Sequence, residues 1–301
     1  MIRGGPVRLR PEIVSYYDET WFDYRVLWMT LRNPAIHFGY WDGATRTHGQ
    51  SLDNMDRVMA DIAQVSPEDR VLDAGCGVGG GAFWLAQNRN ARVQGITIVE
   101  NQAARGRRFA RARQLEDRVS FTCQDFCHTA FADAVFDVVW GRESVCHADD
   151  KGAFFAEALR LLRPGGRLVM ADFARVSRPS SPEAERLLRA WLERWAVPDL
   201  ATPDELLRSA ADAGFDDIQV EDVTFAVEPS LRHLHRLVTA LSPGAKFLHR
   251  LHLRSDVQHG NIKGSEAMWA ARRGGLWVYV IVSARAPRVN DPAQSGQDSR
   301  T

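Results

Sequence analysis

The chain has 301 residues, 45% of them hydrophobic and 25% charged, and its formal net charge is zero. These values are ordinary for a globular protein with a buried core, and the balanced charge argues against bulk attraction to nucleic acid or membranes. No apolar run approaches the roughly 20 residues that a membrane-spanning helix needs. The N-terminus MIRGGPVRLRPE also lacks the apolar centre of a signal peptide. We therefore expect a cytoplasmic protein without a nucleic-acid partner or membrane insertion.

The four cysteines give no sign of a metal site. Cys76, Cys123, Cys127 and Cys146 do not have the spacing of zinc ligands. We expect reduced thiols, as in most intracellular proteins, and no bound metal.

The first 50 residues predict a tail followed by a helical lid. Residues 1–10 are basic, with glycine and proline, and we expect them to be disordered, like the polar tail 286–301. Glu12 to Met29 predicts one or two amphipathic helices with too many aromatic side chains for a face in water. Two interpretations stay open: a lid over a pocket, or a helix packed on the outside of a sheet.

The stretch Arg70 to Trp84, RVLDAGCGVGGGAFW, predicts a strand, a glycine turn and a helix. The strand ends at Asp73, and the turn then contains Gly75, Gly77, Gly79, Gly80 and Gly81. Glycines tolerate positive φ angles and let a ligand approach the backbone closely. In a parallel α/β sheet such a turn lies at the carboxyl end of a strand, where ligands bind. We interpret it as a cofactor loop, and the missing P-loop lysine excludes a phosphate-cradling loop of that type.

Apolar runs alternate with helical ones beyond this loop. Strands are predicted at 92–98, 119–123, 136–140, 166–171, 215–224 and 275–284, and helices at 101–113, 151–162 and 202–214. This alternation is typical of a doubly wound, mostly parallel α/β sheet with helices on both faces. The residues that follow each parallel strand are therefore candidates for a site.

Polar residues follow the second and third of these parallel strands. The stretch GITIVENQ contains Thr97, Ile98 and Gln102, and a hydroxyl with an amide can bind ribose hydroxyls without a charge. The next strand is followed by Asp125, which can accept a hydrogen bond from an adenine amino group, and by Phe126, which can cover the ring. A simple turn role for Asp125 is the alternative.

The end of the fourth strand reads WGRESVCHADDK, from Trp140 to Lys151. Glu143 is the candidate general base, because a carboxylate in an apolar pocket has a raised pKa and can accept a proton. His147 is the candidate orienting residue or an alternative base. The other interpretations are that Glu143 caps the next helix or pairs with Arg142, and that His147 only begins a helix.

These motifs together resemble those of the class I S-adenosylmethionine (SAM)-dependent methyltransferases. DAGCGVGG resembles their first motif, and LLRPGGRL resembles the loop before their fifth strand. The patterns around Thr97 and Gln102 and around Glu143 and His147 resemble cyclopropane fatty acid synthases, tocopherol methyltransferases and geranyl diphosphate C-methyltransferases in particular. The resemblance covers residues 51–285 and implies a seven-stranded sheet, with strand seven antiparallel between strands five and six.

The resemblance also implies SAM as the cofactor and a role for each site residue. The acid before the glycines steers the methionine part of SAM, and the residue at position 97 departs from the acid that is commonest there. The expected cofactor residues are Asp73, Gly75, Gly77, Gly79, Thr97, Ile98, Gln102, Asp125, Phe126 and Tyr16. The expected catalytic residues are Glu143, His147 and Tyr17. The chemistry requires no metal.

Two insertions are expected to cap the acceptor pocket of this domain. The first, 173–200, places apolar side chains on one helix face, which either roofs the pocket or packs in the core. These side chains are Leu187, Leu188, Trp191 and Trp195. The second, 229–273, is rich in Arg, Lys and His, and it forms either a site for an anionic acceptor such as a diphosphate ester or a solvated helix face.

The expected function is methyl transfer from SAM to carbon of an apolar small molecule, such as a prenyl or terpenoid natural product of secondary metabolism. N- or O-methylation of a small amine, phenol or acid, with His147 or Tyr17 as the proton acceptor, is the alternative within this chemistry. A non-catalytic SAM-binding protein is an alternative of a different class. An NAD-dependent oxidoreductase is disfavoured, because the turn is not GxGxxG and strand two lacks the acid expected on the ribose. Assembly into a homo-oligomer is left open.

Overall fold

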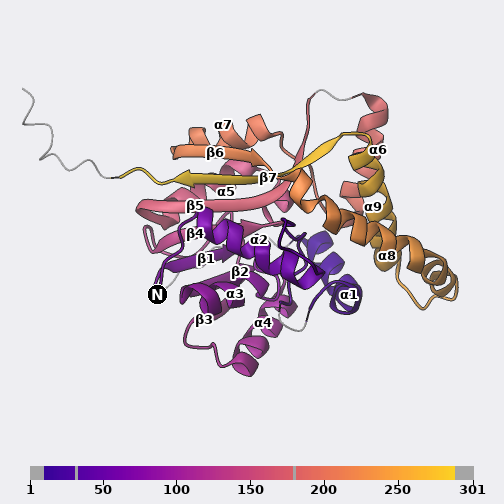
Figure 1. Cartoon of the computed structure of the whole chain (residues 1–301), viewed down its shortest axis with the longest axis horizontal. Coiled ribbons are helices and arrows are strands. Elements are labelled where there is room, and N and C mark those ends of the chain that lie inside the picture. Colours follow the sequence, from indigo (N-terminus) through magenta and orange to yellow (C-terminus); the bar gives the residue numbers. More distant parts are fainter. Residues whose placement is uncertain (1–9, 31–32, 179–180, 289–301) are drawn as a thin grey trace, which may run out of the picture.

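The chain folds around one twisted α/β sheet, as the alternation of apolar runs predicts (Figure 1). The computed structural model describes residues 10–30, 33–178 and 181–288. The ends that the sequence predicts to be disordered, 1–10 and 286–301, lie outside these residues apart from Arg10 and 286–288. None of the described helices combines the length and the apolar character that crossing a membrane requires.

The sheet has seven strands in the order β3-β2-β1-β4-β5-β7-β6. The strands are β1 Arg70–Ala74, β2 Arg92–Thr97, β3 Val119–Cys123, β4 Phe136–Arg142, β5 Leu162–Arg175, β6 Asp216–Asp222 and β7 Trp277–Arg285. Strand β7 runs antiparallel between β5 and β6, and the pairings among β1 to β5 are parallel. The predicted fold class and the place of the last strand are therefore confirmed.

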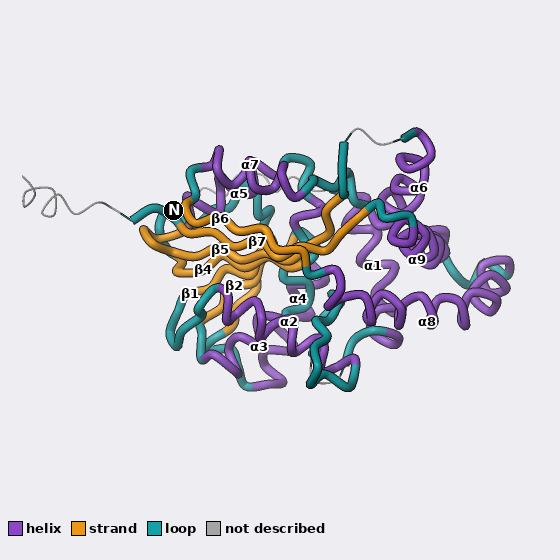
Figure 2. The backbone as a smooth tube through the Cα atoms, turned by 45° about the horizontal axis from the view of Figure 1, so that its top comes forward, coloured by secondary structure: helices purple, strands orange, loops and turns teal. Residues whose placement is uncertain are grey.

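Helices cover both faces of the sheet and one end of it (Figure 2). They are α1 Pro11–Leu27, α2 His48–Ile62, α3 Gly80–Arg89, α4 Glu100–Arg113, α5 Lys151–Leu161, α6 Pro182–Leu192, α7 Pro203–Ala213, α8 Thr224–Arg250 and α9 Asp256–Arg273, with short 3₁₀ turns at Val145–His147 and Glu193–Trp195. Helices α5 and α7 lie on one face and α2 and α3 on the other, while α1, α6, α8 and α9 gather beyond one end of the strands.

Some predicted boundaries were wrong. Strand β5 extends past the predicted 166–171, because its antiparallel pairing with β7 continues as far as Arg175 opposite Trp277. The segment 229–273 is helical, but its first helix, α8, already begins at Thr224, which the sequence predicts to be the end of a strand, and a turn separates α8 from α9. The helix at 202–214 matches its prediction closely, with Thr202 and Glu205 forming a capping box.

An aromatic cluster supports the end of the sheet nearest these helices. The ring of Phe173 lies edge-on to the rings of Trp191, Trp277 and Tyr279, with centroids 5.3 to 5.5 Å apart. All four side chains are buried. Rings of this size fix one another's orientation by packing, so the hydroxyl of Tyr279 is held in a defined direction.

A buried ion pair joins helix α2 to the end of strand β4. The guanidinium of Arg142 contacts the carboxylate of Asp56, and both side chains are almost inaccessible to water. Asn33 donates a second hydrogen bond to Asp56, over 3.0 Å. Removing one partner of such a pair leaves the other charge buried and unpaired.

We expect the substitution Asp56→Ala to lower the free energy of unfolding by about 3–5 kcal/mol, because the buried Arg142 loses its counter-ion. The matched control is Asp61→Ala on the same helix, whose carboxylate is half exposed and pairs with Arg57 and Arg89. That control should lose less than about 1 kcal/mol. Urea denaturation measures both, and similar losses for the two variants would contradict the assignment.

Candidate active site

A cavity of about 440 Å³ lies where the carboxyl ends of β1, β2 and β4 meet helices α1, α8 and α9. Its wall contains every site residue predicted from the sequence except Gly79: Tyr16, Tyr17, Asp73, Gly75, Gly77, Thr97, Ile98, Gln102, Asp125, Phe126, Glu143 and His147. The parallel strands bring these residues together because their carboxyl ends share one edge of the sheet.

The glycine turn is shaped by three left-handed residues. Gly75, Gly77 and Gly79 have φ angles of 80°, 54° and 99°, whereas Gly80 and Gly81 begin helix α3. A Cβ at position 75 or 79 would lie 2.3 to 2.4 Å from side-chain atoms of Ser144 or Phe121. At Gly77 a Cβ would meet nothing, so this backbone faces open space in the cavity.

Asp73 presents an unsatisfied carboxylate oxygen beside this turn. The side chain is 3% exposed, and its Oδ2 has no hydrogen-bond partner among the described residues. Burial raises the pKa of Asp73 to about 7. A buried carboxylate without a partner is costly. A ligand that brings an ammonium group or another donor would relieve that cost, and the open backbone at Gly77 leaves room for it.

The predicted nucleoside side of the site is polar but uncharged at the end of β2. The hydroxyl of Thr97 donates to Oε1 of Gln102 over 2.7 Å and accepts from the backbone N–H of Val99. Asp125 accepts from the N–H of Cys127 over 2.9 Å, as a turn residue does, and it also lines the cavity. The turn role of Asp125 is therefore confirmed, and its contact with adenine stays a prediction.

Glu143 joins three distant parts of the chain. Its Oε1 accepts hydrogen bonds from the backbone N–H of Phe38, over 2.6 Å, and from the hydroxyl of Tyr279, over 2.8 Å. Burial raises the pKa of Glu143 to about 8 despite these two donors. Its φ of 47° is unusual for a residue with a side chain, and such strain is common at functional sites. Pairing with Arg142, the alternative to a site role, is not seen, because Arg142 pairs with Asp56.

His147 is a neutral imidazole held at both nitrogens. Nδ1 lies 3.0 Å from the carbonyl of Ala196, which can only accept, so Nδ1 carries the proton and donates. Nε2 then accepts from the hydroxyl of Tyr17, over 3.0 Å. Burial lowers the pKa of His147 to about 4 and raises that of Tyr17 well above its usual value. His147 belongs to the 3₁₀ turn at Val145–His147 and does not begin helix α5.

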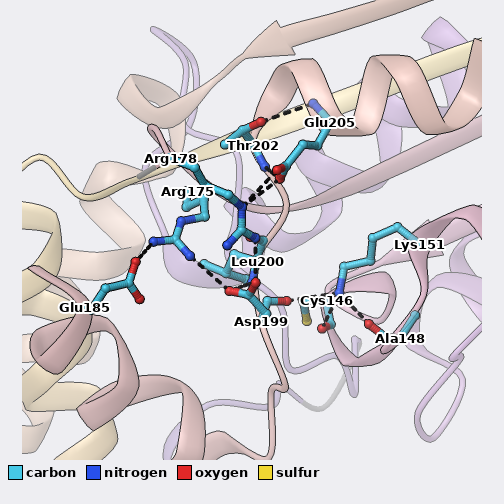
Figure 3. Close-up of polar contacts among 10 residues, drawn as sticks. All are labelled: Cys146, Ala148, Lys151, Arg175, Arg178, Glu185, Asp199, Leu200, Thr202 and Glu205. Atoms are coloured by element: carbon cyan, nitrogen blue, oxygen red, sulfur yellow. Dashed lines mark hydrogen bonds and ion pairs between the residues drawn. The ribbon is translucent and has the colours of Figure 1, made fainter. Parts of the chain in front are cut away.

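Lys151 fastens the turn that carries His147 to the first insertion (Figure 3). Its ammonium donates to the carbonyls of Cys146, Ala148 and Asp199, over 3.0, 2.5 and 3.0 Å. All three ammonium protons thus have acceptors, two on the turn and one on the insertion. Because Ala196 sets the tautomer of His147, this link orients the imidazole indirectly.

Ion pairs continue the same support further from the cavity (Figure 3). The buried guanidinium of Arg175 contacts Glu185 of helix α6 and lies 3.2 Å from Asp199. Arg178 bridges Asp199 and Glu205, over 2.5 and 2.9 Å. The insertion is therefore tied to the ends of β5 and α7.

The two insertions line the cavity with only some of the side chains expected. From the first, Trp195 lines it, but Trp191 packs against Phe173 and Trp277 in the core. From the second, apolar side chains of helix α8 such as Leu234 and Leu237 line it. Of the predicted cationic side chains at 229–273, the cavity wall contains Arg254, and this guanidinium is paired with Asp23 of helix α1 over 2.5 Å. No contact of these cations points to an anion site in the described part of the chain.

Sequence reasoning missed three contributors. His37 is 3% exposed and lines the cavity; its Nδ1 donates to the carbonyl of Phe38 over 2.8 Å, and its Nε2 has no partner within the described residues. Tyr279 and Asp172, which accepts from the N–H of Cys146 over 2.8 Å, hold the segments around Glu143 and His147. The available signal for Asp172 was its place directly after the predicted strand 166–171.

Comparisons with known proteins identify the family of this chain. Residues 72–170 match the family model described as "Methyltransferase domain". The chain is 32% identical to the methyltransferase GfsG of Streptomyces halstedii, over 73% of this chain and 78% of that protein. It is 36% identical to the 27-O-demethylrifamycin SV methyltransferase of Amycolatopsis mediterranei, over 65% of this chain and 71% of that protein.

Solved structures show the same fold. The [4+2]-cyclase SpnF superposes with a TM-score of 0.76 at 24% identity, over 95% of this chain and 99% of that one. Because the sequence relatives cover most of both chains and are methyltransferases, and the cavity joins a glycine turn to an unsatisfied carboxylate, this chain belongs to the class I SAM-dependent methyltransferases.

Proposed function

We propose that the enzyme methylates an apolar natural-product acceptor of prenyl or terpenoid type at carbon, with Glu143 as the proton acceptor. The observation that carries this proposal is a buried carboxyl group of raised pKa in the wall of the cavity. Such a group stabilises positive charge that develops on a carbon skeleton and can then take the proton that leaves it.

Glu143 is a better proton acceptor than His147 in this arrangement. The pKa of Glu143, about 8, suits a base at neutral pH, whereas that of His147, about 4, makes a weak base. The Nε2 of His147 is also occupied by the hydroxyl of Tyr17. We therefore assign His147 and Tyr17 to positioning the acceptor or the wall around it.

The glycine turn, Asp73, Thr97 and Gln102 would hold SAM in this proposal. When bound, SAM supplies an electrophilic methyl group on a sulfonium. The unsatisfied Oδ2 of Asp73 would accept from the ammonium of its methionine part, and the uncharged pair at the end of β2 would face its ribose. Asp125 with Phe126 would bind the adenine, and Ile98 and Tyr16 would complete the wall.

The acceptor end of the cavity is apolar. Helices α1 and α8 contribute Val26, Leu27, Leu234, Leu237 and Val238 to its wall. A wall of this kind binds hydrocarbon by removing it from water, and it keeps water from competing for the methyl group.

O-methylation of a hydroxyl on a similar acceptor is the second candidate. The hydrogen-bonded pair of Tyr17 and His147 favours it, because that pair offers a polar contact for a hydroxyl inside the apolar wall. The name of the rifamycin relative also indicates methylation at oxygen. A SAM-binding protein without turnover, the alternative outside catalysis, is not favoured, because the relatives are methyltransferases.

We expect the substitution Asp73→Asn to weaken SAM binding about tenfold or more, because a charged hydrogen bond to the ammonium is lost. Isothermal titration calorimetry measures the dissociation constant. The control is Asp137→Asn at the opposite end of the sheet, where the carboxylate accepts from the N–H of Arg70. Unchanged affinity in the Asp73 variant would refute its role.

We expect kcat/KM to rise with pH towards about 8 and then to level off, because Glu143 holds its proton below that pH and can accept one only above it. The variant Glu143→Gln should lose about 10²- to 10⁴-fold in kcat. Its SAM affinity should stay close to that of the wild type. A flat pH profile, or an active glutamine variant, would exclude Glu143 as the base.

Product analysis identifies the methylated atom. Incubation with ¹³C-methyl-labelled SAM and a panel of prenyl and terpenoid acceptors should give a product whose labelled methyl is bonded to carbon in the NMR spectrum. Label on oxygen would replace the carbon proposal by the second candidate. SAM binding without labelled product across the panel and across hydroxylated acceptors would favour the non-catalytic alternative.

A further inference from the structure

The cavity opens between helix α1 and the C-terminal half of helix α8, and apolar side chains surround this opening. Phe22, Val26, Leu27, Leu241 and Leu248 all line the cavity and are all exposed, Phe22 to 65% and Val26 to 59%. We call these five residues the apolar mouth. Each of them contributes both to the interior wall and to the outer surface, so an acceptor that enters here passes over apolar groups.

The end of α8 adds a second exposed apolar group beside the mouth. Phe247, Leu251 and Leu253 are 62%, 51% and 70% exposed. We call residues 246–253 the tip. In both views the end of α8 projects away from the sheet (Figures 1 and 2). A group of exposed apolar side chains usually marks a surface that binds another molecule.

The charged side chains of the tip and of the chain around it are basic. Residues 229–255 contain five Arg or Lys residues and four His residues, and no Asp or Glu. Lys246 and Arg250 are exposed and lie one helical turn apart, so they share one side of α8. The ion pair between Arg254 and Asp23, at 2.5 Å, holds the turn after α8 against α1. The turn that follows the tip is therefore held next to the helix that carries Phe22, Val26 and Leu27.

We propose that the tip and the apolar mouth dock on an anionic lipid surface, so that the cavity opens towards the lipid from which the acceptor enters. Segments that expose leucine and phenylalanine beside lysine and arginine bind at the surface of anionic bilayers. A second copy fits less well, because a two-fold contact through this surface would bring Lys246 and Arg250 near the same cations of the partner. The inference rests on the proposed function in one respect, that the acceptor is apolar.

Co-sedimentation with vesicles tests this proposal without SAM or acceptor, so its result does not depend on methyl transfer. The full chain should bind vesicles of phosphatidylglycerol mixed with phosphatidylcholine, weakly bind pure phosphatidylcholine, and be released by high salt. The variants Leu251→Ser/Leu253→Ser and Lys246→Glu/Arg250→Glu should each lower the partition coefficient about tenfold. All four side chains are exposed, so folding, checked by thermal melting, should be unchanged.

The matched control is Leu207→Ser/Arg208→Glu on helix α7, which also removes one exposed apolar and one exposed cationic side chain. It should bind vesicles like the wild type. The proposal is overturned if the wild type stays in solution with phosphatidylglycerol vesicles. It is also overturned if sedimentation velocity shows that the tip variants only convert a dimer to a monomer, which would make a second copy the occupant. If the enzyme binds vesicles but methylates only polar acceptors, the proposed apolar acceptor is wrong and the proposed docking on lipid stands.

Discussion

The arrangement of this molecule depends on two carboxyl groups kept away from water at neighbouring strand ends. Asp73 is the last residue but one of β1, and Glu143 comes directly after β4, which pairs with β1. Burial raises the pKa of the first to about 7 and of the second to about 8. A protein tolerates such groups only if a proton, a donor or a cation stabilises them. Here the glycine turn and the covering helices form a cavity in which a ligand can stabilise both carboxyl groups.

Glu143 is held in an unusual backbone conformation by contacts from distant parts of the chain. Its left-handed backbone carries strain of the order of 1 kcal/mol, which the surrounding contacts must offset. Those contacts come from Phe38, before the sheet begins, and from Tyr279, in its last strand. The carboxyl group is therefore positioned only when the N-terminal segment and β7 are both in place. The aromatic cluster around Phe173 then fixes the ring of Tyr279.

The sequence was sufficient to predict the sheet and the residues that its strand ends bring to the cavity, because parallel strands bring their carboxyl ends to one edge wherever the helices lie. It could not reveal that Tyr279 binds Glu143, since 136 residues separate them and no local pattern links the two. It also could not show that Trp191 packs in the core while Trp195 lines the cavity. The two share a helical spacing, but the 3₁₀ turn at 193–195 directs one to the core and the other to the cavity.

The raised pKa values of Asp73 and Glu143 also connect cofactor binding to proton transfer. A carboxyl group in a dry wall ionises more easily when positive charge enters the same cavity, so a cationic cofactor lowers both pKa values and draws off protons as it binds. In the proposed reaction at carbon, the positive charge of the sulfonium would pass to the carbon skeleton of the acceptor and would leave it with the proton. A nearby carboxylate could stabilise that charge and then accept the proton. We therefore propose that the burial that raises the pKa of Glu143 also suits it to this role.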